Sequence, residues 1–205
     1  MKKTLPVILA VIGLIAGFWF ARQQTSTPPL EISGFAFPAP KQLSDIELVD
    51  QNNQPFDESL FKDKWTFIYV GYTFCPDACP MTMTILDQLY RTLEEDNQLT
   101  DDIAMMLVSV DPHRDTPDRL NSYVSHFNER FVGATGQREQ LKSFADQVSA
   151  IYSVPEDKED PNYLVDHSSS IILIDPNAAV HAIFTPPQQA ENLAKDFVVL
   201  RKRYS

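Results

Sequence analysis

The sequence predicts an α/β sandwich with a mixed β-sheet and flanking helices. The segments 65–72 and 103–110 are almost continuously apolar, as expected of strands buried on both faces of a sheet. An amphipathic helical pattern follows each of these segments. A hairpin pattern and a final helix then close the chain. Strands therefore alternate with helices before an antiparallel pair is added, which is typical of this fold class.

The first residues predict a membrane anchor. Lys2 and Lys3 precede an uncharged run from Leu5 to Ala21, which would span roughly 25 Å as a helix. A cleaved signal peptide and a retained signal-anchor both explain this pattern. The run ends in Gly-Phe-Trp-Phe-Ala, and aromatic rings suit a membrane interface better than a cleavage site. We therefore predict a single-pass anchor over residues 1–22 of a bacterial inner membrane, with the domain on the periplasmic side.

The rest of the chain predicts a linker and one domain. Residues 23–34 begin with a polar, proline-containing stretch and should form a flexible linker. We expect a single folded domain over residues 35–205, without internal repeats. The formal net charge of the chain is −11. Such a surface repels phosphate backbones, so we expect no nucleic acid partner.

The first half of the domain contains two buried strands. Residues 43–49 alternate apolar and polar positions and predict a strand, with a turn at 51–54. The strand at 65–72 follows. After Pro80, apolar residues recur every three or four positions as far as Leu93, which predicts a helix. The second buried strand, 103–110, stops at an Asp-Pro pair.

The second half begins with two helices. Thr116 and Pro117 predict the N-cap and first turn of one helix. Residues 138–151 predict another helix, and 151–154 the start of a strand. The charged run 156–161 predicts a solvated loop.

A hairpin and one more helix complete the domain. Strands are predicted at 170–174 and 180–184, joined by a turn at 175–177. A final helix is predicted over 188–203.

Both cysteines, Cys75 and Cys79, lie four positions apart at the predicted turn between a strand and a helix. Such a pair can form a short disulfide, bind one soft metal ion, or alternate between those states. A helix N-terminus favours negative charge, so we expect a lowered thiol pKa here. In an exported protein the simplest alternative is a structural disulfide. However, so short a loop constrains the unfolded chain very little.

A metal site would need a third ligand from among the four histidines. We expect His126 on an exposed helix face and His181 at the surface or the sheet edge. His113 follows a strand end, where sites often form. His167 is the preferred candidate, because it enters a strand from a polar loop. Asp166 and the following serines could supply the hydrogen bond that fixes a ligating imidazole.

Three motifs resemble those of the Sco/SenC family and occur in the same order: Gly-Tyr-Thr-Phe-Cys-Pro-Asp-Ala-Cys-Pro at 71–80, Ser-Val-Asp-Pro-His-Arg-Asp-Thr-Pro at 109–117 and Tyr-Leu-Val-Asp-His-Ser-Ser at 163–169. The resemblance implies a thioredoxin-like fold in a membrane-tethered copper-binding protein that helps to assemble cytochrome c oxidase. It also implies that one copper ion per chain is held by Cys75, Cys79 and His167.

The chain departs from the family pattern at two positions. His113 stands where most members have Glu or Lys, and Ala178 replaces a glycine expected in the turn of the hairpin.

Two thiolates and an imidazole are a soft ligand set that suits Cu(I), and an oxygen from Asp111 or Asp77 could complete a site for Cu(II). Zinc accepts the same three ligands. A catalytic zinc site would also need a general base, and the motifs nominate none.

Several functions remain open. The resemblance favours copper delivery to the CuA centre of cytochrome c oxidase subunit II, with other copper chaperones or thioredoxin-like reductases as further partners. A thiol–disulfide oxidoreductase that reduces the recipient's cysteines, and a redox or copper sensor, would use the same thiols. Disulfide exchange has no use for His167, so the histidine favours metal binding. A peroxide reductase would need Thr three positions before its reactive cysteine, where Tyr72 stands.

Overall fold

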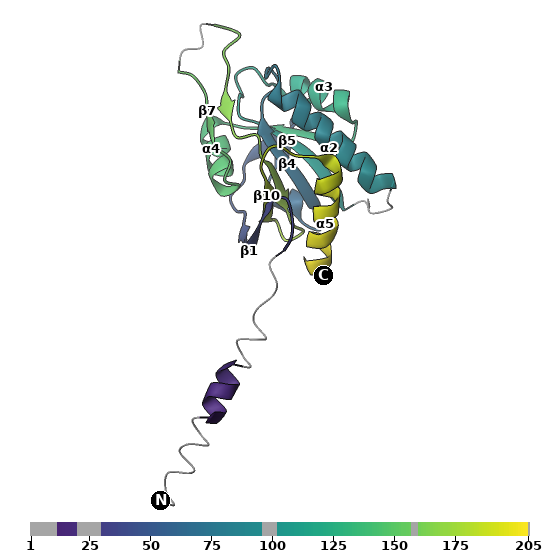
Figure 1. Cartoon of the computed structure of the whole chain (residues 1–205). Coiled ribbons are helices and arrows are strands. Elements are labelled where there is room, and N and C mark those ends of the chain that lie inside the picture. Colours follow the sequence, from purple (N-terminus) through teal and green to yellow (C-terminus); the bar gives the residue numbers. More distant parts are fainter. Residues whose placement is uncertain (1–11, 20–29, 96–101, 157–159, 205) are drawn as a thin grey trace, which may run out of the picture. The chain divides into compact units, whose positions relative to one another are not determined.

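The computed structural model describes residues 12–19, 30–95, 102–156 and 160–204 (Figure 1). The chain divides into two compact units, Met1–Glu31 and Ile32–Ser205. In the first unit, residues 12–19 are helical. No helix among the described residues is long and apolar enough to cross a membrane. Much of the predicted anchor and most of the predicted linker lie outside the described residues, so both stay predictions.

The second unit is built on an eight-stranded mixed sheet. Its strand order is β1-β10-β9-β4-β5-β6-β2-β3. The central strands β4, β5 and β6 are parallel, and β9 pairs with β4 in the antiparallel sense. In the same order, the strands are Phe35–Gln42, Ala179–Phe184, Ile171–Ile174, Trp65–Gly71, Ile103–Ser109, Val132–Thr135, Leu48–Asp50 and Pro55–Phe56.

Helices cover both faces of this sheet. Figure 1 shows α2, α3 and α5 on one side and α4 on the other. They span Ala78–Glu95, Pro117–Phe127, Ala190–Tyr204 and Arg138–Gln147, respectively. A short 3₁₀ helix, η1, covers Glu58–Phe61. As predicted, Thr116 caps α3, because its side chain accepts a hydrogen bond from the Arg119 N–H.

The core forms where the helices meet the central strands. Every residue of β4 is buried, which confirms the prediction from its continuous apolar sequence. Phe197 of α5 packs edge-on against Trp65 and Phe67 of β4, with ring centroids 5.7 and 5.3 Å apart. These contacts fix the direction of β4, whose carboxyl end begins the loop that carries the cysteines.

The edges of the sheet differ from the prediction. The predicted strand at 43–49 is wrong over most of its length, since β1 ends at Gln42 and β2 begins at Leu48. Leu43 and Ile46 are buried, but they lie in the segment between β1 and β2 and not in a strand. Both edge strands contain proline: β1 has an irregular register between Ala36 and Lys41, a stretch with two prolines, and β3 begins at Pro55.

β6 was not predicted as a strand. A second, two-stranded sheet pairs β7 (Tyr152–Ser153) with β8 (Asp166–His167). β7 lies within the strand start predicted at 151–154, whereas β8 was not predicted. The predicted hairpin of β9 and β10 is present, and Ala178 adopts a left-handed conformation in its turn, with φ of 61°. The backbone therefore keeps a glycine-like turn although the residue is alanine.

Candidate metal centre

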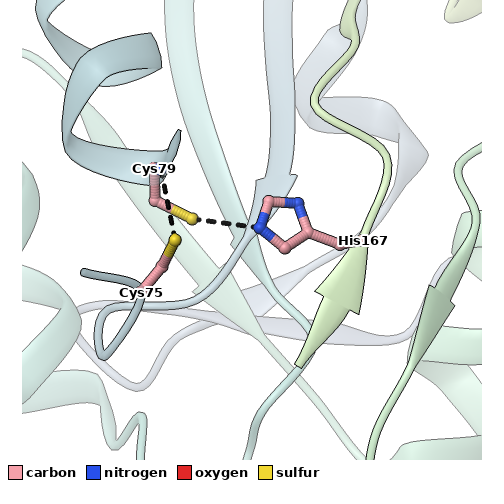
Figure 2. Close-up of side chains that lie close together, drawn as sticks. All are labelled: Cys75, Cys79 and His167. Atoms are coloured by element: carbon pink, nitrogen blue, oxygen red, sulfur yellow. Dashed lines mark hydrogen bonds between the residues drawn. The ribbon is translucent and has the colours of Figure 1, made fainter. Parts of the chain in front are cut away.

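Cys75, Cys79 and His167 come together at the carboxyl end of β4 (Figure 2). One potential ligand atom from each residue lies within 4.8 Å of the others. The Cys79 Sγ is 3.4 Å from the His167 Nε2. The Cys79 backbone N–H donates to the Cys75 Sγ at 3.4 Å. Both cysteines are free thiols. The three residues proposed from the sequence thus form one cluster.

The cysteine positions follow from how β4 passes into α2. Cys75 lies in the connecting loop and is half-buried, whereas Cys79 lies in the first turn of α2 and is 0% exposed. Gly71, the last residue of β4, allows this close approach. A Cβ at this position would lie 2.8 Å from the Cys79 Sγ and 2.9 Å from the Tyr69 ring. The absence of a side chain at Gly71 therefore makes room for the buried thiol.

Asp115 anchors the loop that carries Cys75. Its carboxylate accepts hydrogen bonds from the Thr73 backbone N–H at 2.8 Å and from the Thr73 hydroxyl at 2.6 Å. The Ser109 hydroxyl also donates to it, and Asp115 is 0% exposed. Burial raises the pKa of Asp115, although these hydrogen bonds oppose the shift. Residue patterns did not identify Asp115, but it lies inside the 109–117 motif that carried the family resemblance.

His167 is held by the small sheet and by two tyrosines of the β4 end. It pairs with Tyr152 across β7 and β8. The Tyr69 and Tyr72 rings pack edge-on against the imidazole at 5.8 and 5.7 Å. The Tyr72 hydroxyl also accepts a hydrogen bond from the Val165 N–H at 3.2 Å. These contacts join the histidine segment to the strand that leads to the cysteines.

The tautomer of His167 suits metal binding. Its Nδ1 lies 3.3 Å from the Ser168 backbone oxygen, which can only accept a hydrogen bond. A proton on Nδ1 would be donated to this oxygen and would leave the lone pair of Nε2 facing the Cys79 sulfur. Burial lowers the pKa of His167, which favours the neutral imidazole that a metal needs.

Burial also favours the neutral thiol form of Cys79. It raises the pKa of this thiol to about 12, and neither a hydrogen bond from the Tyr72 backbone nor the Tyr69 hydroxyl at 3.6 Å reverses the shift. The prediction of a lowered pKa is therefore wrong for Cys79. The reason is that desolvation outweighs the favourable field of the α2 N-terminus.

The two carboxylates considered as a fourth ligand lie outside the described cluster. Asp111 is 0% exposed, and its oxygens accept hydrogen bonds from the Arg114 Nε and, at 2.6 Å, from the Tyr163 hydroxyl. Its role is therefore structural in this arrangement. Asp77 is exposed, and its backbone oxygen accepts the Met81 N–H at 3.2 Å, which supports the start of α2.

The remaining histidines do not join the described cluster. His113 and His126 are exposed, and for His126 this confirms the prediction. His181 was expected at the surface or the sheet edge, but its side chain is only 13% exposed. It packs edge-on against Trp65, with centroids 5.2 Å apart, and lies 3.3 Å from an Asp175 oxygen. The prediction failed because β1 pairs with β10, so that β10 is not an edge strand, and because the Trp65 and Tyr204 rings pack against the imidazole.

The cluster offers two sulfur atoms and one imidazole nitrogen on one side of a metal ion. This set fits a soft ion that accepts three ligands and leaves one position open. Its partial burial excludes much of the solvent, while the exposed side of Cys75 leaves a route for an incoming ligand.

Comparisons with known proteins agree with this geometry. The model of the SCO1/SenC family matches residues 38–200. An SCO2-like protein of Rickettsia conorii is 36% identical over 177 residues, which cover 85% of each chain. The structure of yeast Sco1 with copper bound matches with a TM-score of 0.75 and 28% identity, covering 81% of this chain and 91% of that one.

A copper-bound structure from a plant also matches the fold of this chain. Arabidopsis thaliana ScoI with copper bound matches with a TM-score of 0.72 and 30% identity, covering 78% of this chain and 97% of that one. The mixed sheet with flanking helices is therefore the thioredoxin-like fold that was predicted. By its sequence and its fold, the chain belongs to the SCO1/SenC family.

Proposed function

We propose that this protein is a membrane-tethered copper chaperone that delivers copper to the CuA centre of cytochrome c oxidase subunit II. One copper ion would bind to Cys75, Cys79 and His167. The observation that carries the proposal is the convergence of two thiols and a neutral imidazole within 4.8 Å. Two relatives of similar fold, yeast Sco1 and Arabidopsis ScoI, have been solved with copper bound.

The ligands differ in how easily a recipient can reach them. Cys79 is buried and receives the Tyr69 hydroxyl at 3.6 Å, whereas Cys75 is half-buried in a loop. An incoming ligand would therefore approach copper beside Cys75 and replace that thiolate first. Cys79 and His167 would hold the ion until the recipient has supplied a second ligand. Such stepwise exchange keeps copper coordinated throughout the transfer.

The proposed location follows from the first residues. Lys2 and Lys3 before an uncharged run support an inner-membrane anchor with the domain on the periplasmic side. On that side the domain could meet the exposed CuA domain of the oxidase and exchange copper or electrons with other copper chaperones and thiol reductases.

A second candidate function is reduction of the recipient's disulfide. The contrast between the half-buried Cys75 and the buried Cys79 favours it, because disulfide exchange needs one accessible and one resolving thiol. The Cys75 thiolate would attack the recipient's disulfide and release one recipient thiolate. Cys79, after losing its proton, would then displace the second thiolate. The recipient gains two electrons, and this chain is left with a Cys75–Cys79 disulfide.

Copper transfer distinguishes the two functions. The chain loaded with one equivalent of Cu(I) is mixed anaerobically with a purified apo CuA domain whose cysteines are reduced, and copper is measured in each protein after separation. Delivery predicts that copper moves to the CuA domain. If no copper moves, and the chain instead reduces a recipient supplied as its disulfide, the reductase function replaces the proposal.

The ligand set is tested separately. His167→Ala and the double variant Cys75→Ser/Cys79→Ser should each weaken copper binding, and the double variant should abolish the thiolate-to-copper charge-transfer band of the Cu(II) form. His126→Ala is the matched control, because this histidine is exposed and outside the cluster. Unchanged binding in His167→Ala would remove the histidine from the ligand set.

A further inference from the structure

Arg114 contacts both the loop that carries Cys75 and the segment that leads to His167. It belongs to the turn between β5 and α3, and its side chain is only 8% exposed. Its Nε donates to the Asp111 carboxylate, which is itself fully buried. Burying a charged side chain costs free energy, and Arg114 touches none of the proposed ligands. The other contacts of its guanidinium group show what the residue does.

On one side, Arg114 holds the segment that leads to His167. The guanidinium stacks on the Tyr163 ring with its central carbon 3.5 Å from the centroid. Its Nη1 donates to the Pro161 backbone oxygen at 3.0 Å. The Tyr163 hydroxyl donates to Asp111 at 2.6 Å, so Arg114, Asp111 and Tyr163 form a closed set. Tyr163 is itself buried and lies in the same motif as His167.

On the other side, the same guanidinium contacts the cysteine loop. It lies 4.6 Å from the centroid of the Phe74 ring and 5.6 Å from that of Tyr72. Phe74 directly precedes Cys75 and is 38% exposed. Arg119 also lies against Phe74, at 3.9 Å, and its Nε donates to the Thr73 hydroxyl, so these two contacts both lie within the cysteine loop. Arg114 thus contacts both loops.

We propose that Arg114 is a positioning residue of the metal centre, which sets the separation of Cys75 and His167 by holding Phe74 and Tyr163 on one guanidinium. This inference rests on the proposed function, because it takes those two residues as ligands of one copper ion. A planar guanidinium can stack on a ring while its edge donates hydrogen bonds. A lysine ammonium would keep the charge beside Asp111 but would lose the stacking and the fork of donors.

A double-mutant cycle with His167 tests the proposal. The Cu(I) affinity of the full chain in detergent is measured by competition with a chromophoric chelator for wild type, Arg114→Lys, His167→Ala and the double variant. We expect Arg114→Lys to weaken binding about tenfold, as for other residues that orient a ligand. In the His167→Ala background the same change should weaken binding much less, because the separation of Cys75 from an imidazole no longer matters.

Other outcomes separate the inference from the proposed function. An equal loss in both backgrounds, or no loss in either, overturns the role of Arg114 and leaves the ligand set intact. If His167→Ala binds copper as tightly as wild type, the ligand set fails, and the inference fails with it. Arg201→Lys is the matched control. Its guanidinium pairs with Asp102 at 2.7 Å, where both side chains are about one-third exposed, and the change should leave copper affinity unaltered.

A second variant covers the case in which Arg114→Lys fails to fold. Phe74→Leu removes the contact on the cysteine side and leaves the Arg114–Asp111 pair in place. Phe74→Leu should likewise weaken copper binding more in the presence of His167 than in the His167→Ala background. Weakening of copper binding by Phe74→Leu to the same extent with and without His167 would overturn the proposal.

Discussion

In the proposed copper site Cys79 is a buried thiol, and this determines the expected sign of the pH dependence. Because burial raises the pKa of Cys79 to about 12, the metal-free chain keeps this proton throughout the neutral range. Copper must displace it, so the apparent affinity should rise about tenfold per pH unit from this thiol alone. Competition titrations between pH 6 and 9, corrected for protonation of the chelator, measure the slope. An affinity independent of pH would contradict the assignment of Cys79.

Gly71 offers a second test at the residue scale. In Gly71→Ala the new Cβ would lie 2.8 Å from the Cys79 Sγ, so the thiol must move away from its present position. We expect copper affinity to fall about tenfold or more, with a loss of about 1–3 kcal/mol in the free energy of unfolding from overpacking. Chelator competition and denaturant titration measure the two effects.

Gly136→Ala is the control for this variant. Its Cβ would also meet a side chain at 2.8 Å, but the atom contacted is the Cδ2 of Leu48. Stability should fall in both variants, whereas copper affinity should fall only in Gly71→Ala. Equal copper affinities in the two variants would show that the space beside Cys79 is unimportant.

The three residues of the cluster were easier to predict than the residues that hold them in place. Two cysteines beside a strand end and a histidine between polar residues carry their chemistry in the local sequence. The hydrogen bonds of Asp115 join it to Thr73 across 42 positions, and no periodicity links the two. The pKa of Cys79 was predicted in the wrong direction for a related reason. The helix N-terminus is visible in the sequence, whereas complete burial depends on tertiary packing.

At the scale of elements, the loop between β4 and α2 depends on Asp115. In Asp115→Asn one acceptor oxygen becomes a donor, so the three donors from Thr73 and Ser109 can no longer all be satisfied. We expect a loss of about 1–3 kcal/mol in the free energy of unfolding and a weaker Cu(II) charge-transfer band. Denaturant titration and absorption spectroscopy test these effects.

Asp146→Asn provides the comparison for Asp115→Asn. This carboxylate pairs with Lys142 at 2.8 Å, and both side chains are largely exposed. Its loss should change stability by less than about 1 kcal/mol and leave the spectrum of the copper form unaltered. If both aspartate variants behave alike, Asp115 does not anchor the cysteine loop.

Long and buried elements were predictable, whereas several short ones were not. β4 and β5 are almost continuously apolar over seven residues each, and α2 repeats its apolar positions over several turns. β7 falls within the strand start predicted at 151–154, but β8 has only two residues, too few to show any period. β1 was missed because two prolines interrupt its pattern. β8, the strand that carries His167, therefore forms because it pairs with β7, and its own sequence shows no strand pattern.

At the scale of the whole molecule, copper should stabilise the second unit, Ile32–Ser205. A metal bound only by the folded chain adds about 4 kcal/mol when its free concentration is a thousand times the dissociation constant. For a domain of this size the melting temperature should rise by roughly 10 °C. Calorimetry with and without a Cu(I) chelator measures the shift. The double variant Cys75→Ser/Cys79→Ser should show no shift, and a shift there would place copper elsewhere.

The prolines at both edges of the large sheet limit how this protein can associate with others. Pro38 and Pro40 interrupt β1, and Pro55 occupies one of the two positions of β3. Proline lacks the N–H that an added strand would need, so neither edge offers a continuous template for another chain. Copies at high local density would therefore resist fibrillar self-assembly. A partner protein would have to be recognised through side chains rather than through shared backbone pairing.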